Sequence, residues 1–378
     1  MSKARLFFAG DFCAKPTTSL ISVSDELKDL IQSCDLKVVN FEVPLKPEVT
    51  LPPQSYERLW QHDDVPEFLK NLGFNLFSMA NNHAFDWGEA GYWKTRSALG
   101  DQVFGVGTYD EAYQVKVCSV EGAKIGFMAL TYAAYTGVFD DVYHQEGLGC
   151  AYIHDLRVNH DIVEAKKQVD YLFILPHDGI EYIDVPLPET IARYRDFIDW
   201  GADGVIGSHP HCPQGWEEYK GKPIFYSLGN FFFNSKDNTL YRAWNRPHWY
   251  EGMCVVMTLR DGGIKYQIVN TKNYDNIRIA IDNRLERSDH NVELQSYLFD
   301  KKKYCAYLKT QCRELSEKRE IPIIDGVFHF NKVSVKRLIK SWAKLLLKKK
   351  ESIDFSLYVL LKDSTRKNLL LRYLRKEA

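Results

Sequence analysis

The sequence contains no long hydrophobic run. Although 45% of its residues are hydrophobic, they do not form a continuous apolar stretch of about 18 residues, the length that indicates a membrane-spanning helix. The first residues, MSKARLFFAGD, contain an apolar run that is too short for the core of a signal peptide. These absences exclude a helical membrane protein by composition, and we therefore expect a cytoplasmic protein.

The sequence also lacks paired cysteines and an excess of charge of one sign. Its eight cysteines include no C-x-x-C pair, so we expect free thiols in a reducing compartment and no disulfide framework. Lys and Arg (49) nearly balance Asp and Glu (50), and no recognition motif accompanies the basic residues. We therefore expect no nucleic acid as a partner.

What the sequence does contain is an alternation of short apolar stretches and helix-like, amphipathic ones. The apolar stretches are RLFFAGD, LKVVNFE, FNLFSMANNH, VDYLFILPHDG and DGVIGSHPH, and each ends in polar residues. The helix-like stretches are 24–34, 64–72, 88–99 and 189–200. This alternation predicts an α/β fold with a layered sheet. Two hairpin patterns, at 115–130 and 252–270, predict that the sheet is not purely parallel.

The polar residues at the ends of the apolar stretches are candidates for a metal site. In α/β folds the carboxyl ends of the strands meet at one edge, where ligands bind. Each residue alone could serve a turn or a helix cap, but together they supply carboxylate, amide and imidazole donors, which suit Mn, Fe or Zn better than Ca or Mg. On extended chain, His209 and His211 would point the same way and address one ion or two adjacent ions.

Longer blocks of the sequence resemble a known family. The blocks AGDFCAK, VVNFEVPL, SMANNHAFDWGEAG, ILPHDGIEY and GSHPHCPQGWEEYKGKPIFYSLGNFFF occur in this order between residues 4 and 260. They resemble the CapA family of poly-γ-glutamate capsule synthesis proteins, which has the calcineurin-like metallophosphoesterase fold. The resemblance implies a layered α-β-β-α sandwich, which we place at residues 1–284. The charged, helix-period sequence beyond it predicts a basic, mainly helical C-terminal region over residues 285–378.

The resemblance also implies roles for the polar residues. The implied metal ligands are Asp11, Glu42, Asn82, His177, His209 and His211. Asp11 and His83 are the implied catalytic residues, with His83 as a proton donor or transition-state stabiliser.

The chain departs from the wider fold at Cys13. The wider fold has Asp-x-His where this chain has Asp11-Phe12-Cys13. One metal position therefore keeps Glu42, Asn82, His177 and His209, whereas the other keeps only Asp11, Glu42 and His211. We expect one firm site for a divalent Mn, Fe or Zn ion and a second, weak one. Cys13 is either a buried packing residue or a substitute ligand.

A second departure is Asp178, which stands where relatives have Trp in a His-Trp-Gly sequence. Asp178 either orients His177 through its other ring nitrogen or lies in a solvated loop. Basic residues near the motifs are the substrate-binding candidates, because guanidinium groups bind phosphate and carboxylate well. These candidates are Arg193, Arg242, Arg246 and His248.

Two functions are compatible with these residues. The first is a metal-dependent hydrolase of the phosphoester type that acts in the biosynthesis of a capsule or another cell-surface polymer. Its substrate would be an anionic polymer, a glycan or a phosphoester. The second is a non-catalytic, metal-containing assembly factor that binds an anionic polymer.

The C-terminal region differs in charge from the rest of the chain. Residues 331–378 contain 14 Lys and Arg but only 4 Asp and Glu. Within them, apolar residues at helical spacing predict a basic amphipathic helix over 334–350. Such a helix either docks on an anionic membrane surface, which would place the protein at the inner face of the membrane, or packs on the acidic remainder of the chain.

Overall fold

The structure, a computed structural model, describes residues 3–15, 17–51, 58–132, 137–139, 146–234 and 247–318. These residues form two compact units divided after Phe299. The first unit contains the sheets, and the second contains helix α9 (Lys301–Lys318). The predicted boundary at residue 284 and the predicted helix at 334–350, which lies outside the described residues, stay predictions.

The first unit contains a nine-stranded mixed sheet with β1 at its centre. β1 pairs in parallel with β3 and β14 and antiparallel with β15. In order across the sheet the strands are β2 (Ser22–Val23), β17 (Arg278–Ile281), β16 (Gly263–Tyr274), β15 (Glu251–Arg260), β1 (Lys3–Ala14), β3 (Leu36–Phe41), β4 (Leu76–Ser78) and β5 (Val103–Phe104), with β14 (Asn230–Asn234) also beside β1.

A second sheet of six strands is parallel at its centre. Its strands in order are β12 (Trp216–Tyr219), β13 (Lys222–Phe225), β11 (Gly204–Ile206), β10 (Tyr171–His177), β8 (Ala123–Thr131) and β7 (Lys116–Val120). A short two-stranded sheet is formed by β6 (Val106–Gly107) and β9 (Gly149–Cys150).

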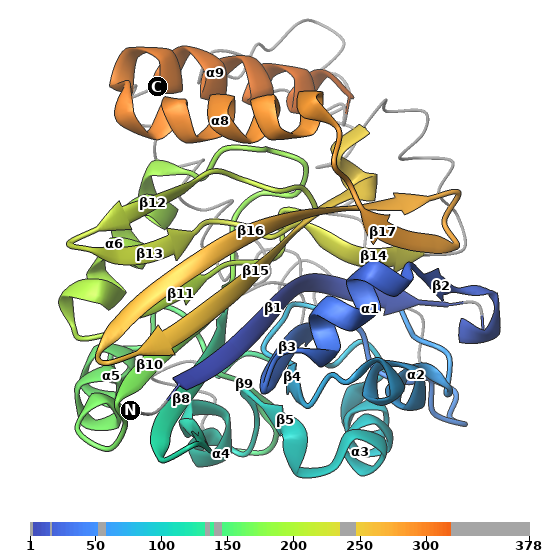
Figure 1. Cartoon of the computed structure of the whole chain (residues 1–378). Helices are drawn as coiled ribbons and strands as arrows, with labels where there is room; N and C mark the ends of the chain where they lie inside the picture. Colours follow the sequence, from blue (N-terminus) through green and yellow to red (C-terminus); the bar gives the residue numbers. More distant parts are fainter. Residues whose placement is uncertain are drawn as a thin grey trace, which may run out of the picture. The chain divides into compact units, whose positions relative to one another are not determined.

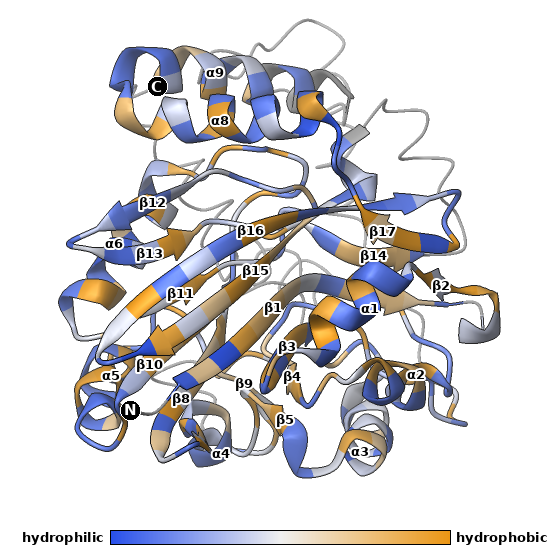
Figure 2. Cartoon of the chain, in the orientation of Figure 1, coloured by the Kyte–Doolittle hydropathy of each residue, from blue (hydrophilic) through white to orange (hydrophobic). Residues whose placement is uncertain are grey.

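The two large sheets pack face to face and are covered by helices on their outer sides (Figure 1). Phe8 of β1 meets Phe127 of β8 and Phe173 of β10, with ring centroids 6.3 and 5.6 Å apart. The inner strands are the most apolar parts of the unit (Figure 2), as expected for strands buried on both faces. This arrangement confirms the predicted α-β-β-α sandwich.

The helices fall where the amphipathic stretches predicted them. The four predicted stretches correspond to α1 (Asp25–Gln32), α2 (Val65–Leu72), α3 (Gly88–Leu99) and α6 (Pro188–Asp199). Among the described residues of this unit, the other helices are α4 (Tyr109–Tyr113), α5 (Arg157–Lys166), α8 (Leu285–Phe299) and the 3-10 turns η1 (Thr18–Leu20), η2 (Gly100–Gln102) and η3 (Pro247–Tyr250). Among the described residues, no helix has both the length and the apolar character needed to span a membrane.

Both predicted hairpins form. β7 and β8 are joined at Glu121 and Gly122, and β15 and β16 at Asp261 and Gly262. All four turn residues have positive φ, between 46° and 86°, which is the conformation of a two-residue type I′ turn. These antiparallel pairs explain why the sheets are mixed.

Candidate metal centre

Asp11 is positioned by an irregularity in β1. The register of β1 with both of its parallel neighbours shifts next to Asp11. A side chain at Gly10 would bring its Cβ to 1.9 Å from the Gly229 carbonyl oxygen, so the close approach at this point requires glycine. Pairing with β14 carries β1 on to Ala14, so the strand does not end at Asp11 as the apolar pattern indicated. The register shift is a β-bulge, and it turns the Asp11 side chain toward the site.

Glu42 follows β3 directly and is completely buried, yet neither of its carboxylate oxygens has a hydrogen-bond partner. Burial, and then the neighbouring Asp11 and Glu181, raises the pKa of Glu42 well above its ordinary value. Burial also raises the pKa of Asp11, although His211 and Asn40 oppose this shift. A buried carboxylate without hydrogen bonds is costly unless a cation compensates it. This donor set therefore fits a bound metal ion.

Three donors of the expected firm site lie around the fourth, His177, and among the described residues the donor atoms of Asp11, Glu42 and His177 all lie within 4.8 Å of one another. His177 Nε2 lies 2.8 Å from Asn82 Oδ1, 3.2 Å from His209 Nδ1 and 3.8 Å from Glu42 Oε1. Donors that share a tetrahedral ion at 2.0–2.1 Å lie about 3.3 Å from one another. Burial, followed by His209 and His211, lowers the pKa of His177 well below its ordinary value, and the neutral imidazole is the form that binds metals.

The donors of the expected weak site also lie beside Glu42. His211 Nε2 is 3.4 Å from Glu42 Oε1, and its Nδ1 is 3.5 Å from Asp11 Oδ2. Asn230 Oδ1 lies 2.9 Å from His211 Nδ1, so a proton on Nδ1 leaves Nε2 to face Glu42. Asn230 thus fixes a histidine of the site, and its own amide nitrogen donates to the Trp249 carbonyl.

His209 and His211 do not lie on extended chain, which corrects the expectation from their spacing. Their φ angles are 98° and 56°, a region that non-glycine residues seldom adopt and that costs about 1–3 kcal/mol per residue. The turn is held by hydrogen bonds from the His209 amide to Asp11 Oδ2 (3.1 Å) and from the Tyr182 amide to the Pro210 carbonyl (2.7 Å). The tertiary structure, not the two-residue spacing, brings both rings to the site.

His83, the implied proton donor, lies in the turn between β4 and α3. Its Nδ1 is 2.9 Å from Asp86 Oδ2. Burial opposes protonation of His83, but the Asp86 carboxylate outweighs this effect, so the pKa of His83 is raised. A protonated imidazole with an orienting carboxylate can act as a general acid. Sequence reasoning missed Asp86, although its position three residues after His83 was a usable signal.

His177 is oriented by residues that sequence reasoning did not assign. Its Nδ1 lies 3.0 Å from Ser208 Oγ and 3.2 Å from Asn40 Nδ2. Asn40 also donates to Asp11 Oδ1 at 2.7 Å. Asp178, one of whose two interpretations was to orient this ring, is buried and accepts a hydrogen bond from the Thr190 hydroxyl instead. The solvated-loop alternative does not hold either.

Cys13 is completely buried on β1. Burial, and then the nearby Glu42, raises the pKa of its thiol well above the ordinary value, which opposes formation of the thiolate that metals bind. Among the described residues, Cys13 does not belong to any group whose donor atoms are close enough to share an ion. These observations favour a packing role for Cys13.

The described substrate-binding candidates are engaged within the fold. The Arg193 guanidinium donates to the Ile153 carbonyl, Asn159 and Asp196, so it ties α5 and α6 together. The Nδ1 atom of His248 lies within hydrogen-bond distance of the Glu251 carboxylate. The other two candidates, Arg242 and Arg246, lie outside the described residues.

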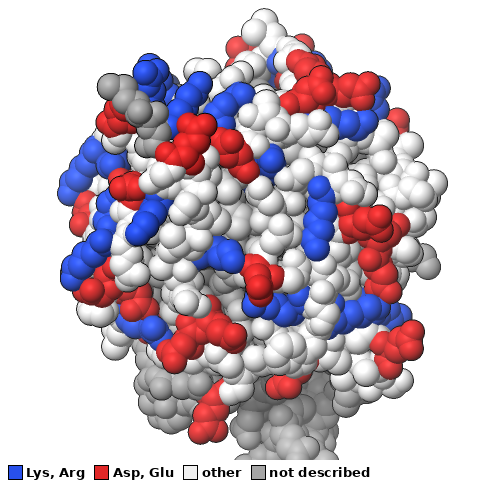
Figure 3. All heavy atoms as spheres, turned by 60° about the horizontal axis from the view of Figure 1, so that its bottom comes forward, with Lys and Arg blue, Asp and Glu red and all other residues white. Residues whose placement is uncertain are grey.

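On the face shown in Figure 3, acidic and basic side chains are interspersed around an uncharged central area. Charges of either sign do not gather there into one continuous patch. Recognition of a charged substrate on this face would thus depend on local groups and not on a broad field.

The two packed sheets, with buried carboxylate, amide and imidazole side chains at the ends of their strands, have the layered architecture of a metallophosphoesterase-like sandwich. More specifically, the chain belongs to the family described as bacterial capsule synthesis protein PGA_cap, whose profile matches residues 6–235. This match confirms the family that the sequence blocks indicated.

Curated relatives include capsule synthesis proteins. The "Capsule biosynthesis protein CapA" of Bacillus anthracis is 28% identical over 249 residues, which cover 62% of this chain and 56% of that protein. The "PGA biosynthesis protein CapA" of Bacillus subtilis (strain 168) is 29% identical over 220 residues, covering 56% and 57%. The chain thus spans little more than half the length of these relatives.

Among solved structures, the chain is similar to one described as a novel phosphatase of Mycoplasma pneumoniae. It is 15% identical, has a TM-score of 0.45, and covers 71% of this chain and 94% of that one.

Proposed function

We propose that this protein is a metal-dependent hydrolase of the phosphoester type that acts in the biosynthesis of a capsule or another cell-surface polymer. The observation that carries the proposal is the Glu42 carboxylate, which is buried without hydrogen bonds among oxygen and nitrogen donors from both sheets. Membership of the capsule synthesis family supports the biosynthetic setting. The proposed substrate is an anionic polymer, a glycan or a phosphoester.

Each residue of the centre has a distinct task in this proposal. A divalent Mn, Fe or Zn ion held by Glu42, Asn82, His177 and His209 would lower the pKa of a bound water and polarise the scissile group. His83 holds a proton on its ring with the help of Asp86 and delivers it to the leaving oxygen. Asp11 and His211 supply the remaining donors beside Glu42.

Metal content and turnover, measured on the same preparations, test the proposal. Purified protein is analysed for bound Mn, Fe and Zn and assayed with a generic phosphodiester and phosphomonoester. We expect His83→Gln to retain its metal but to lose about 10²–10⁴-fold in rate, the usual contribution of general acid catalysis. His160→Gln is the matched control, because this histidine is exposed on α5. Equal rates in both variants would remove His83 from the reaction.

An assembly factor is the second candidate function. The observation that favours it is the buried Cys13, which stands where the wider fold has a metal-binding imidazole and so leaves one metal position with fewer donors. Tight metal binding and retention of an anionic polymer such as poly-γ-glutamate, without turnover of any ester tested, would support this function. Turnover that is lost together with the metal would exclude it.

A further inference from the structure

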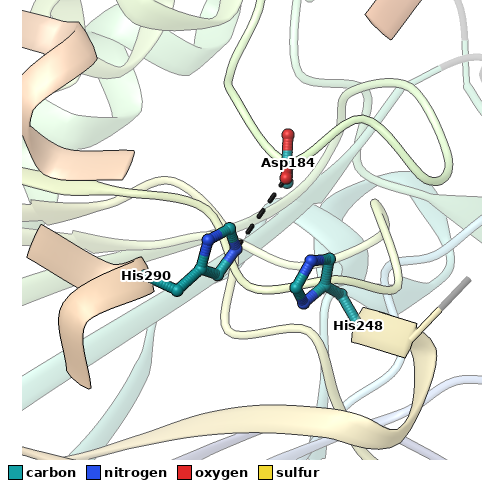
Figure 4. A group of neighbouring side chains, drawn as sticks. All are labelled: Asp184, His248 and His290. Carbon is teal, nitrogen blue, oxygen red and sulfur yellow. Dashed lines mark ion pairs between the residues drawn. The ribbon is translucent and has the colours of Figure 1, made fainter. Parts of the chain in front are cut away.

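A second group of potential ligands lies on three segments that do not contribute donors to the first centre. Asp184 is in the loop after β10, His248 is in η3 and His290 is in α8 (Figure 4). One ligand atom of each residue lies within 4.8 Å of the others. Figure 4 shows the two imidazole rings side by side, with the Asp184 carboxylate above them.

We propose that Asp184, His248 and His290 form a second divalent metal site, suited to Zn²⁺. Two imidazoles and one carboxylate are a common set of protein ligands for zinc, and three protein ligands leave one position for water. The same donors exclude Ca²⁺ and Mg²⁺ as the preferred ions, because these cations select oxygen ligands.

The surroundings of His290 are those of a metal ligand. Its Nε2 is buried and has no hydrogen-bond partner. The nearest carboxylate oxygen, Asp184 Oδ2, is 3.8 Å away (Figure 4). A direct hydrogen bond would have closed to about 2.7–3.2 Å. Two ligands of one ion, in contrast, keep a separation of more than 3 Å, so the pair is spaced for a shared metal.

The second imidazole is oriented as zinc ligands usually are. His248 Nδ1 is 2.8 Å from Glu251 Oε2, and a carboxylate at one ring nitrogen directs the other nitrogen to a metal. Arg284 in turn holds the other oxygen of Glu251 at 3.2 Å. The His248 ring stacks on that of His290, with centroids 4.3 Å apart and an angle of 6°, so one ring has to tilt out of the stack for both rings to bind the same ion.

The local charge also favours a dication. Acidic residues at the cluster or its supports outnumber basic ones by four to three, namely Asp184, Glu251, Asp282 and Glu293 against Lys272, Arg284 and Arg287. This balance of charge suits a site that binds a dication.

This site would be structural and adjacent to the first centre. An ion there would connect α8 to η3 and to the loop that follows His177. Trp249, next to His248 in sequence, packs on the His211 ring with centroids 4.8 Å apart. Occupancy of the second site would therefore help to hold the wall against which a ligand of the first centre rests.

Zn²⁺ binding to the full-length chain tests the proposal. The Glu42→Gln variant disables the first centre, so that binding to the second can be measured alone by calorimetry and by Co²⁺ absorption. We expect about one Zn²⁺ to remain, and His290→Gln or Asp184→Asn in this background to weaken it by at least about tenfold. The control is His160→Gln in the same Glu42→Gln background. Because His160 is exposed on α5, this change is expected to leave Zn²⁺ binding unchanged.

Co²⁺ spectra separate this site from the cysteines of the chain, because thiolate ligands add a charge-transfer band that imidazole and carboxylate lack. Unchanged Zn²⁺ affinity in both ligand variants, or a Co²⁺ spectrum dominated by thiolate, would overturn the proposal. His290→Gln decides the matter if Asp184→Asn does not fold, because His290 is partly exposed on a helix. Zn²⁺ should also raise the melting temperature of Glu42→Gln but not of Glu42→Gln with His290→Gln.

Discussion

The two histidine and carboxylate clusters of this protein differ in how the fold builds them. The first cluster draws Asp11, Glu42 and His177 from β1, from the end of β3 and from β10, and all three are at most 1% exposed. The second draws Asp184, His248 and His290 from a loop, a 3-10 turn and a helix, and its two histidine side chains are 34% and 19% exposed.

The comparison shows that buried side chains and a strained backbone occur together in the first cluster, which we propose as the catalytic centre. The first cluster contains a carboxylate without hydrogen bonds and two histidines with positive φ. The second cluster has an ordinary backbone at both histidines and a solvent-accessible side. Backbone strain and unpaired buried charge destabilise a protein and are retained mainly at functional sites. The two sites should therefore respond differently to metal, chelator, mutation and pH.

The largest expected effect is a change of sign in the stability of Glu42→Gln. Without metal, this variant should be at least as stable as the wild type, because it removes a buried carboxylate that lacks hydrogen bonds. With free metal at 1,000 times its dissociation constant, the wild type gains about 4 kcal/mol that the variant lacks. Urea unfolding with and without metal measures both. A variant less stable than the wild type in both conditions would contradict the metal assignment.

The second expected effect is on the rate of metal release. A chelator should remove the ion from the first centre at least about ten times more slowly than from the second, because a buried site must open locally first. Stopped-flow release of Co²⁺ from Glu42→Gln and from His290→Gln separates the two sites. Equal rates would show that burial does not protect the first centre.

The third effect concerns backbone strain at His209. His209→Gly should be more stable than His209→Ala by about 1 kcal/mol, because glycine tolerates a φ of 98°. His177 in β10 is the matched position, and there alanine should be the more stable by about 0.5–1 kcal/mol. Thermal unfolding of the four metal-free variants gives the comparison, and the same order at both positions would argue against strain in the loop.

The smallest effect is a difference in the sign of pH dependence. Burial opposes ionisation of Glu251, but the hydrogen bond with His248 and the charge of Arg287 outweigh it and lower its pKa. Glu251 therefore stabilises the fold above its unfolded pKa, and this stability is lost as the pH falls through the folded value. The pKa of Glu42 is raised, so metal-free stability should instead decrease as the pH rises from about 4.5 through its folded value.

Urea unfolding between about pH 3 and 7 of three metal-free proteins, the wild type, Glu251→Gln and Glu42→Gln, measures these slopes. The Glu251 contribution changes below about pH 4.5 and the Glu42 contribution above it. Each variant should remove the contribution of its own carboxylate. If the free energy of unfolding had the same pH dependence in both variants, the two carboxylates would not contribute to stability with opposite signs.

The amino-acid sequence alone predicted much of the fold and the membership of the first cluster. Apolar alternation located the helices and the hairpins, because the helix and strand periods are local properties of the chain. The donors of the first cluster follow apolar strands, and the ends of parallel strands meet at one edge in any such sheet. The assignment of each donor to a role nevertheless came from family resemblance and not from periodicity.

Only the tertiary structure decided how those donors are held and where the second cluster lies. The bulge at Asp11 depends on the approach of Gly229 to Gly10, and Asn40 meets His177 only when the two sheets pack. Asp184, His248 and His290 carry no shared motif, because each comes from a different kind of element. Local sequence specifies periods and turns, whereas the distance between residues far apart in the chain is set by packing of the whole core.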